Sequence, residues 1–322
     1  MSKFCLTLSS IAALACLTQT GFAQQYSVKD IGALSEKKMS SPAAITNNNQ
    51  IAGTSFSGSN DDAAFRYVSE KDYIEVLDQT SSGSVSHARG INETGAVVGD
   101  STFGGAAYGP SPYFHAALFM NGSAYDLGSL RSGEFSSAKS INDAGQVVGF
   151  SGPNANGDYA RAFLWTQKLG MQDIGTLGGD NAQASAINAS GGITGNAQIY
   201  LKNGPAHAFF FQSDAGVDAP SYPMMDLGTL GGDSSYGTAI NASNHIAGYS
   251  TLADGRFHAF LVSGGKMLDL GSLGAKDIQA DQSVALGLNS SDQVVGYSYL
   301  PRSGASFTTS APIVAPQPAA FV

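Results

Sequence analysis

The sequence predicts an all-β fold, a six-bladed β-propeller with four-stranded blades. Three observations support it: a long internal repeat, four short strand-like runs in each copy, and two chain ends that each match part of one copy. The chain has 322 residues, which would allow two domains. Because the repeat occupies nearly all of residues 24–322, we expect a single domain there, preceded by a signal peptide at residues 1–23.

The repeat is clearest in residues 173–195 and 226–248, which are nearly identical. Every copy contains an isoleucine or leucine, here called the anchor, with a glycine eight residues later. The six anchors are Ile45, Ile91, Ile141, Ile187, Ile240 and Leu288, and the six glycines are Gly53, Gly99, Gly149, Gly195, Gly248 and Gly296. Because this spacing never changes, we expect each copy to fold into the same unit.

Each copy contains four short runs rich in β-branched and aromatic residues, bounded by Gly, Asn and Asp, which is typical of strands. Only Gly, Asn or Asp occurs four residues after the anchor, and these residues tolerate a positive φ best. We therefore predict a tight hairpin turn with a left-handed residue at Asn49, Gly95, Gly145, Gly191, Asn244 and Asp292. The asparagine beside most anchors can bond the backbone of its own turn.

Small residues stand one and three positions before each anchor, for example Ala186 and Ala184 before Ile187. These positions share one face of a strand. We interpret the run that contains the anchor as the innermost strand of a blade, where neighbouring blades converge on a channel.

The two chain ends match complementary parts of one copy. Residues 26–34 match the fourth run of a copy, and residues 319–322 match the third run. We therefore predict that the N-terminal strand completes the last blade, which closes the ring and leaves no unpaired sheet edge.

Several short motifs recur along the chain. They are His-Ala-Phe at residues 207–209 and 258–260, Asp-Leu-Gly-Thr-Leu-Gly-Gly at 226–232, Ala-Ile-Asn at 186–188 and 239–241, and Val-Val-Gly-Tyr-Ser at 294–298. In these residues the chain resembles the HAF family of bacterial extracellular repeat proteins, over residues 26–322. The first copy departs from the pattern, with Ala63 in place of the histidine and Thr46 in place of the asparagine. The resemblance implies a secreted bacterial protein, and it brings no established activity or catalytic residue.

The signal peptide is predicted from an apolar run at residues 4–17 after Lys3, and from the small-x-small pattern of residues 21–23. Both cysteines, Cys5 and Cys16, lie inside it, so we expect no disulfide in the mature chain; lipid attachment at Cys16 is the alternative to ordinary cleavage. A net charge of −9 without a Lys/Arg cluster argues against a nucleic-acid partner. We expect a secreted or periplasmic protein with no integral membrane segment after signal removal.

Three histidines, His115, His207 and His258, occupy equivalent places in their copies and suggest a metal site. Arg161 stands at the same place in another copy, and an arginine cannot coordinate a metal. We therefore expect these histidines to make hydrogen bonds at a strand edge, and we predict no metal and no cofactor. The Gly-Gly-Asp loops that end at Asp180 and Asp233 likewise lack the several carboxylates of a calcium loop.

No nucleophile-elbow, zinc-peptidase or phosphate-loop motif occurs, and Trp165 is the only tryptophan. We therefore predict a non-catalytic binding module and assign no catalytic residue. The alternative is a propeller hydrolase or lyase that acts on an extracellular or cell-wall substrate. A cluster of three or more charged or histidine side chains with shifted pKa values at the channel mouth would favour that alternative.

The ligand, a glycan or a peptide, is predicted on the face that carries the loops between second and third strands, since these loops vary most in length. The loop at residues 100–114 contains Tyr108, Tyr113 and Phe114, whose rings could stack on a ligand or pack against their own blade. Asp180 and Asp233, in loops between blades, complete the predicted set of ligand-binding residues.

Overall fold

The computed structural model describes residues 30–34, 39–56, 62–77, 85–103, 113–132, 134–153, 159–200, 204–213, 223–273, 281–299 and 311–312. The chain divides into two compact units, residues 1–31 and 32–322, and the second contains all of the described strands. Every secondary-structure element described in the second unit is a β-strand, which confirms the prediction of an all-β fold.

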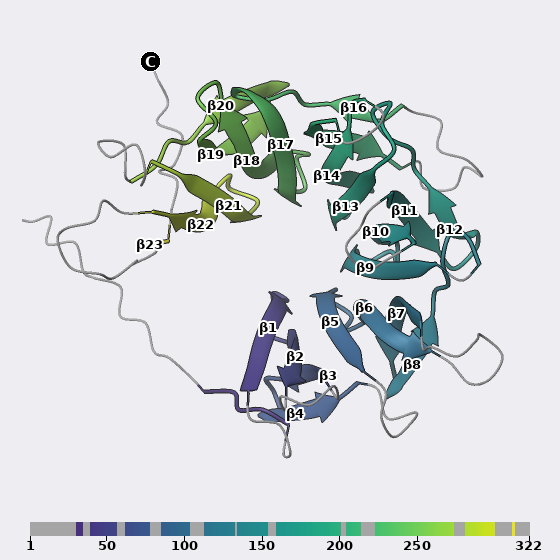
Figure 1. Ribbon diagram of the computed structural model, residues 1–322. Coiled ribbons are helices and arrows are strands. Elements are labelled where there is room, and N and C mark those ends of the chain that lie inside the picture. Colours follow the sequence, from purple (N-terminus) through teal and green to yellow (C-terminus); the bar gives the residue numbers. More distant parts are fainter. Residues whose placement is uncertain are drawn as a thin grey trace, which may run out of the picture. The chain divides into compact units, whose positions relative to one another are not determined.

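The strands form six antiparallel sheets that follow one another along the chain (Figure 1). The first sheet has β1 (Met39–Ile45), β2 (Ile51–Phe56), β3 (Ala63–Val68) and β4 (Tyr73–Val76), and the second has β5 (Ser86–Ile91), β6 (Val97–Phe103), β7 (Tyr113–Met120) and β8 (Ser123–Asp126). The third has β9 (Phe135–Ile141), β10 (Val147–Gly152), β11 (Arg161–Thr166) and β12 (Gly170–Asp173), and the fourth has β13 (Ala182–Ile187), β14 (Gly192–Gln198), β15 (Ala206–Gln212) and β16 (Met225–Asp226). The fifth has β17 (Gly231–Ile240), β18 (Ile246–Leu252), β19 (Phe257–Ser263) and β20 (Lys266–Asp269), and the sixth has β21 (Ser283–Leu288), β22 (Val294–Ser298) and β23 (Ala311–Pro312).

Within every sheet the strands pair in chain order, and consecutive sheets contact each other, for example β6 with β9 and β10 with β13. The hydrophobic core lies between these sheets. One cluster joins Val98 and Ala116 of the second sheet to Ala138 and Val147 of the third, all fully buried. The four-strand prediction is confirmed for the first five sheets. In the sixth, β23 is the third strand, and residues 319–322, predicted for that place, lie outside the described residues.

The predicted turn is present in all six copies. The residue four positions after each anchor has a positive φ, from 60° at Asn49 and Asp292 to 81° at Gly95, which confirms the left-handed assignment. The asparagine beside the anchor also bonds its own turn, since the Asn142 side-chain oxygen accepts the Gln146 backbone N–H at 3.0 Å.

The same asparagines also join one sheet to the next. Their side-chain amides donate to the backbone carbonyl of the equivalent asparagine in the following sheet. These bonds run from Asn92 to Asn142 (3.1 Å), Asn142 to Asn188 (3.0 Å), Asn188 to Asn241 (2.8 Å) and Asn241 to Asn289 (3.1 Å). Each asparagine thus stabilises both its turn and the packing of two sheets.

A β-bulge interrupts the first strand of all six sheets two residues before the anchor. The extra residues are Ala43, Arg89, Lys139, Ser185, Thr238 and Leu286. Next to the bulge the two strands approach closely, and a Cβ on Gly99 would overlap the carbonyl oxygen of His87. The equivalent glycine in every other sheet meets the same obstacle, which explains the fixed position of this glycine after the anchor.

Candidate functional site

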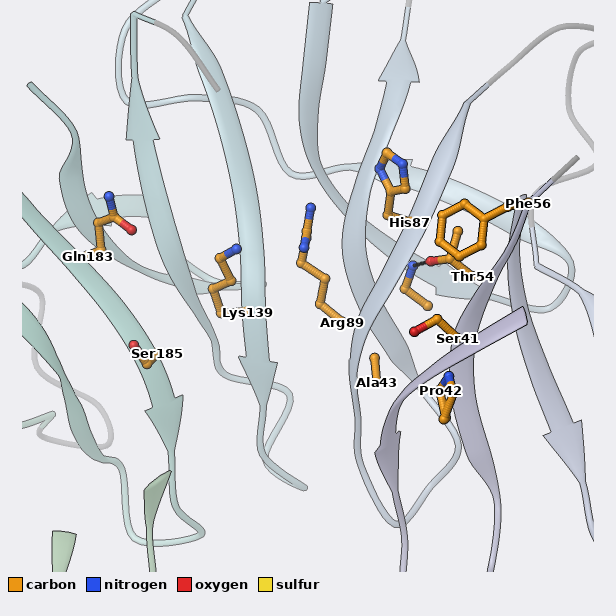
Figure 2. A pocket seen from close by; sticks show the side chains of 11 residues that line it. Ser41, Pro42, Ala43, Thr54, Phe56, His87, Arg89, Lys139, Gln183 and Ser185 are labelled. Atoms are coloured by element: carbon orange, nitrogen blue, oxygen red, sulfur yellow. Dashed lines mark hydrogen bonds between the residues drawn. The ribbon is translucent and has the colours of Figure 1, made fainter. Parts of the chain in front are cut away.

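A cavity of about 700 Å³ is lined by residues of the first strands of four sheets, β1, β5, β9 and β13. The bulge residues of these strands, Ala43, Arg89, Lys139 and Ser185, all belong to its wall. Figure 2 shows the side chains of Arg89 and Lys139 extending from neighbouring strands into the same space. Arg89 and Lys139 are the only charged residues among the six bulge residues, and the bulge directs both side chains into the cavity.

Asp100 organises the charged part of this wall. It lies opposite His87 in the β5–β6 pair, and its side chain is 2% exposed. His87 Nδ1 lies 2.7 Å from one carboxylate oxygen, and Arg89 Nε donates to the other at 2.6 Å. The Ser137 hydroxyl, from the third sheet, donates to that second oxygen at 2.7 Å. The carboxylate is thus fully bonded, and it fixes His87 and Arg89 beside each other.

The electrostatics of this group follow from its contacts. Burial alone would raise the pKa of Asp100, but the hydrogen bonds from His87, Arg89 and Ser137 and the charge of Arg89 outweigh it and lower that pKa to about 2. The hydrogen bond to Asp100 raises the pKa of His87, although burial and Arg89 oppose this. His87 is therefore held towards its protonated form.

The ring of His87 is also held from two other sides. Its Nε2 lies 3.4 Å from Asp62 Oδ2, a longer contact than that to Asp100. Its face stacks on Phe114, with ring centroids 5.8 Å apart. The imidazole is therefore fixed in place, and Nε2 is the ring nitrogen held less tightly.

Lys139 is in a different situation. Its ammonium lies 5.2 Å from the centre of the Phe150 ring, and within the described ranges no carboxylate pairs with it. Burial and the positive charge of Arg89 lower the pKa of Lys139 to about 8, while Asp100 acts in the opposite direction. The cavity wall therefore carries a lysine whose pKa lies closer to neutral pH than that of an ordinary lysine.

The residues predicted from sequence divide between this site and elsewhere. Phe114 is at the site, stacked on His87. Tyr113 pairs with Phe103 at the start of β7, and its side chain, like all of Tyr108, lies outside the described residues. Asp180 lines a different cavity, beside Arg161 and Tyr159, and Asp233 is exposed on β17. The structure does not bring the two aspartates to the wall of Arg89 and Lys139.

Asp180 and Asp233 share a repeat position with a buried aspartate. Both stand seven residues before an anchor, as Asp281 does in the sixth sheet. Asp281 is buried, and its carboxylate lies 3.1 Å from His258 Nε2 of the preceding sheet. Asp281 thus links the fifth and sixth sheets, whereas Asp233 at the same position is exposed.

Sequence reasoning missed His87, Arg89, Asp100 and Lys139. The sequence did contain one signal for Arg89 and Lys139. They are charged, whereas the residue two positions before the anchor is uncharged in the other four copies. The bulge itself could not be read from the sequence, so these charges looked like ordinary surface residues.

The histidines of the third strand have the structural role that was predicted. His115, His207 and His258 lie 2.8–3.0 Å from aspartates of the adjacent fourth strand. Arg161 bonds Asp173 in the same way, at 2.9 Å. Among the residues that the structure describes, no group of three or more His, Cys, Asp or Glu is placed to hold a metal ion. The same residues contain no helix that is long and apolar enough to cross a membrane.

Comparison with known proteins gives a likeness of fold. No family model and no curated protein matches the chain. A crystal structure of puromycin hydrolase matches with a TM-score of 0.53 and 15% identity, over 86% of this chain and 43% of the other. A puromycin-hydrolyzing peptidase of Mycobacterium tuberculosis matches with a TM-score of 0.52 and 9% identity, over the same shares. The chain thus spans less than half the length of these two structures, and at this identity the likeness shows a propeller-like fold.

The comparison corrects one prediction. The matching structures with a TM-score above 0.5 are of puromycin hydrolases and a puromycin-hydrolyzing peptidase, and this finding overturns the predicted non-catalytic binding module. The error came from the search for contiguous motifs. His87, Arg89 and Lys139 come from two different repeats and form no motif in the sequence.

Proposed function

We propose that the protein is an enzyme, a hydrolase or lyase that acts on an extracellular or cell-wall substrate at the wall formed by His87, Arg89 and Lys139. The observation that carries this proposal is Lys139, a partly buried residue of the cavity wall whose pKa is lowered to about 8. A catalytic base works best when its pKa lies near the operating pH. Lysines that serve only solubility stay fully hydrated and keep their ordinary pKa.

In this proposal Lys139 accepts a proton and His87 donates one. In a hydrolysis, neutral Lys139 takes a proton from a water molecule, whose oxygen forms a bond to the electrophilic carbon of the substrate. In an elimination, Lys139 takes a proton from carbon, and the electron pair left behind forms a double bond. In both, the bond to the leaving group breaks, the leaving atom takes the proton of His87, and solvent then returns both residues to their starting states.

The test is turnover by the mature protein, residues 24–322, on a panel of extracellular and wall-derived glycans and peptides, with products identified by mass spectrometry. We expect one class to be cleaved, and Lys139→Gln to lower the rate by about 100-fold or more. Lys266→Gln, which removes an exposed lysine of β20, is the matched control and should keep the wild-type rate. Absence of turnover on the whole panel, or equal rates for Lys139→Gln and the wild type, would contradict the proposal.

The closure of the fold into six blades is part of the same proposal, because an open ring would expose the site strands of the first sheet. Residues 32–34 support it. The Leu34 backbone N–H donates to the Ser55 hydroxyl at 3.3 Å, and the Ser40 hydroxyl donates to the Gly32 carbonyl at 2.8 Å. Three other joints, from the second to the third sheet, the fourth to the fifth and the fifth to the sixth, use the same two bonds, for example Leu273 to Ser298 at 2.9 Å and Ser283 to Gly271 at 2.6 Å.

The exposed anchor of the first sheet gives further support. Ile45 is 64% exposed, whereas the anchors Ile141 and Ile187 are 7% and 8% exposed between neighbouring sheets. A sheet packed against β1 would bury Ile45 in the same way. Residues 26–29, outside the described ranges, are those we assign to the fourth strand of the last blade.

We also propose that the protein is secreted, through a signal peptide at residues 1–23.

A further inference from the structure

A second cavity, here called the groove, has a volume of about 650 Å³ and lies between the second and third sheets. The second sheet contributes Leu118 of β7 and Tyr125 of β8, and the third contributes Trp165 of β11. The turn between β9 and β10 adds residues 143–146. No described residue lines both the groove and the charged wall of the first cavity, so the groove is a separate site.

The groove is open because this joint lacks a side chain that fills the preceding one. Between the first and second sheets, Arg66 reaches the turn glycine Gly95 and donates to its carbonyl at 2.5 Å. A Cβ on Gly95 would overlap the Arg66 guanidinium. In the second sheet Leu118 occupies the position of Arg66, and no described atom lies within 4 Å of the place where a Cβ on Gly145 would be. The shorter leucine thus leaves the space over the turn empty.

Trp165 is exposed in the groove although its equivalents are buried. Four other sheets have a residue that is at most 7% exposed at this position of the third strand: Tyr67, Phe119, Phe211 and Val262. Trp165 is only partly buried, and its indole N–H makes no hydrogen bond within the described part of the chain. Tyr125, from the other sheet, is 50% exposed. Each of the two sheets therefore presents an aromatic side chain to the groove.

The polar groups of the groove call for an occupant that both donates and accepts hydrogen bonds. The indole N–H of Trp165 needs an acceptor. Asp143 needs a donor, because one of its oxygens accepts the Glu93 N–H at 2.9 Å and the other has no partner among the described residues. No Lys, Arg or His is among the described residues that line the groove. An ammonium group only donates and a carboxylate only accepts, whereas a hydroxyl does both.

We propose that the groove binds a neutral glycan, with a sugar ring packed against Trp165 and Tyr125 and its hydroxyls bonded to Asp143 and the indole N–H. A sugar ring has a broad apolar face with hydroxyls at its edge, which matches aromatic side chains flanked by polar groups. The inference goes beyond the proposed function, because no step of that reaction uses the groove. A glycan held here would raise the effective concentration of its neighbouring units at the protein.

The experiment is titration calorimetry on the mature protein, residues 24–322, with cellohexaose, xylohexaose, mannohexaose and chitohexaose as neutral probes and oligolysine as the cationic peptide. We expect one neutral glycan to bind. Trp165→Phe, which installs the residue that the second and fourth sheets have at this position, should lower its affinity about 10-fold, because ring area and the indole N–H are lost. Tyr125→Ala should also weaken binding. Tyr73→Ala, which removes an exposed tyrosine of β4, is the matched control and should bind as the wild type does.

A second variant fills the groove and leaves Trp165 in place. Leu118→Arg combined with Tyr125→Glu recreates the pair of Arg66 and Glu75 in the first sheet, where Arg66 Nε donates to Glu75 at 2.5 Å. We expect this variant to lose glycan binding and to keep a melting temperature close to that of the wild type. No binding of any neutral glycan, tighter binding of oligolysine, or wild-type affinity in both Trp165→Phe and the filled variant would overturn the inference. Since the measurement is of binding, its result does not depend on the proposed reaction.

Discussion

The side-chain amide of Asn188 donates a hydrogen bond to the backbone carbonyl of Asn241 at 2.8 Å, although the two residues belong to different sheets. The Asn188 side-chain oxygen also accepts the Gly192 N–H of its own turn, at 2.8 Å. Because the residue is buried and both bonds are lost together, Asn188→Ala should lower the free energy of unfolding by about 1–3 kcal/mol. Urea denaturation measures this change.

A threonine at the same place separates the two bonds. The first sheet has Thr46 there, and its hydroxyl accepts the turn N–H of Gln50 at 3.0 Å. Asn188→Thr should therefore keep the turn bond, lose the bond between sheets, and unfold between the wild type and Asn188→Ala. If Asn188→Thr is as unstable as Asn188→Ala, the bond between sheets accounts for the whole effect.

The turn residue Gly145 has a φ of 75°, and nothing lies within 4 Å of the place where its Cβ would be. Gly145→Val should cost more than about 1 kcal/mol, since a β-branched residue is strained at positive φ. Gly145→Asn should stay within about 0.5 kcal/mol of the wild type, because space is free and Asn49 and Asn244 already adopt this φ. Equal melting temperatures for the two variants would show that backbone conformation is not what selects glycine here.

Closure by the N-terminal strand predicts the effect of a short deletion. A mature protein that starts at Asp30 would lack residues 26–29, which we assign to the last blade. We expect a clearly lower melting temperature and concentration-dependent association, because two sheet edges become exposed. Light scattering and calorimetry are the measurements. A deletion variant that remains monomeric and as stable as the mature protein would rule out this closure.

The bonds around Asp100 predict how stability depends on pH. The pKa of Asp100 is about 2 in the folded protein, against an ordinary value of 3.8. The bonded carboxylate therefore contributes stability above pH 3.8, and this contribution is lost as the pH falls through about 2. It amounts to roughly 2 kcal/mol, and the stability difference between the wild type and Asp100→Asn should shrink over this range. His87, with a raised pKa, contributes in the opposite sense, and its share is lost as the pH rises through its folded pKa.

The pH dependence of turnover tests the role of Lys139. Its pKa of about 8 means that the neutral base forms as the pH rises towards that value, while His87 must keep its proton, so kcat should rise with pH to a maximum and then fall as His87 deprotonates. Lys139→Arg keeps a positive charge but cannot act as a base at these pH values, so the rise should disappear. A profile that is unchanged in Lys139→Arg would assign the ionisation to another group.

Much of the fold could be predicted because its rules act locally. The positive φ at Asn49 and Gly95 follows from the residue types allowed in the turn, and the strand order follows from the order of the runs. The charged wall could not be predicted in this way. His87 and Lys139 are 52 residues apart, and they meet because a bulge turns Lys139 inward and a hairpin places Asp100 opposite His87.

The bulge has a consequence for how the protein can change over time. Its extra residue has no partner across the β-ladder, so replacing it leaves the pairing of the two strands intact. Four of the six bulge residues line the cavity, each from a different sheet. A duplicated unit can therefore diverge in chemistry at one position while its scaffold stays constant. These positions are the natural choice for a combinatorial library aimed at new specificities, with Ala43 and Ser185 randomised first because they carry no charge network.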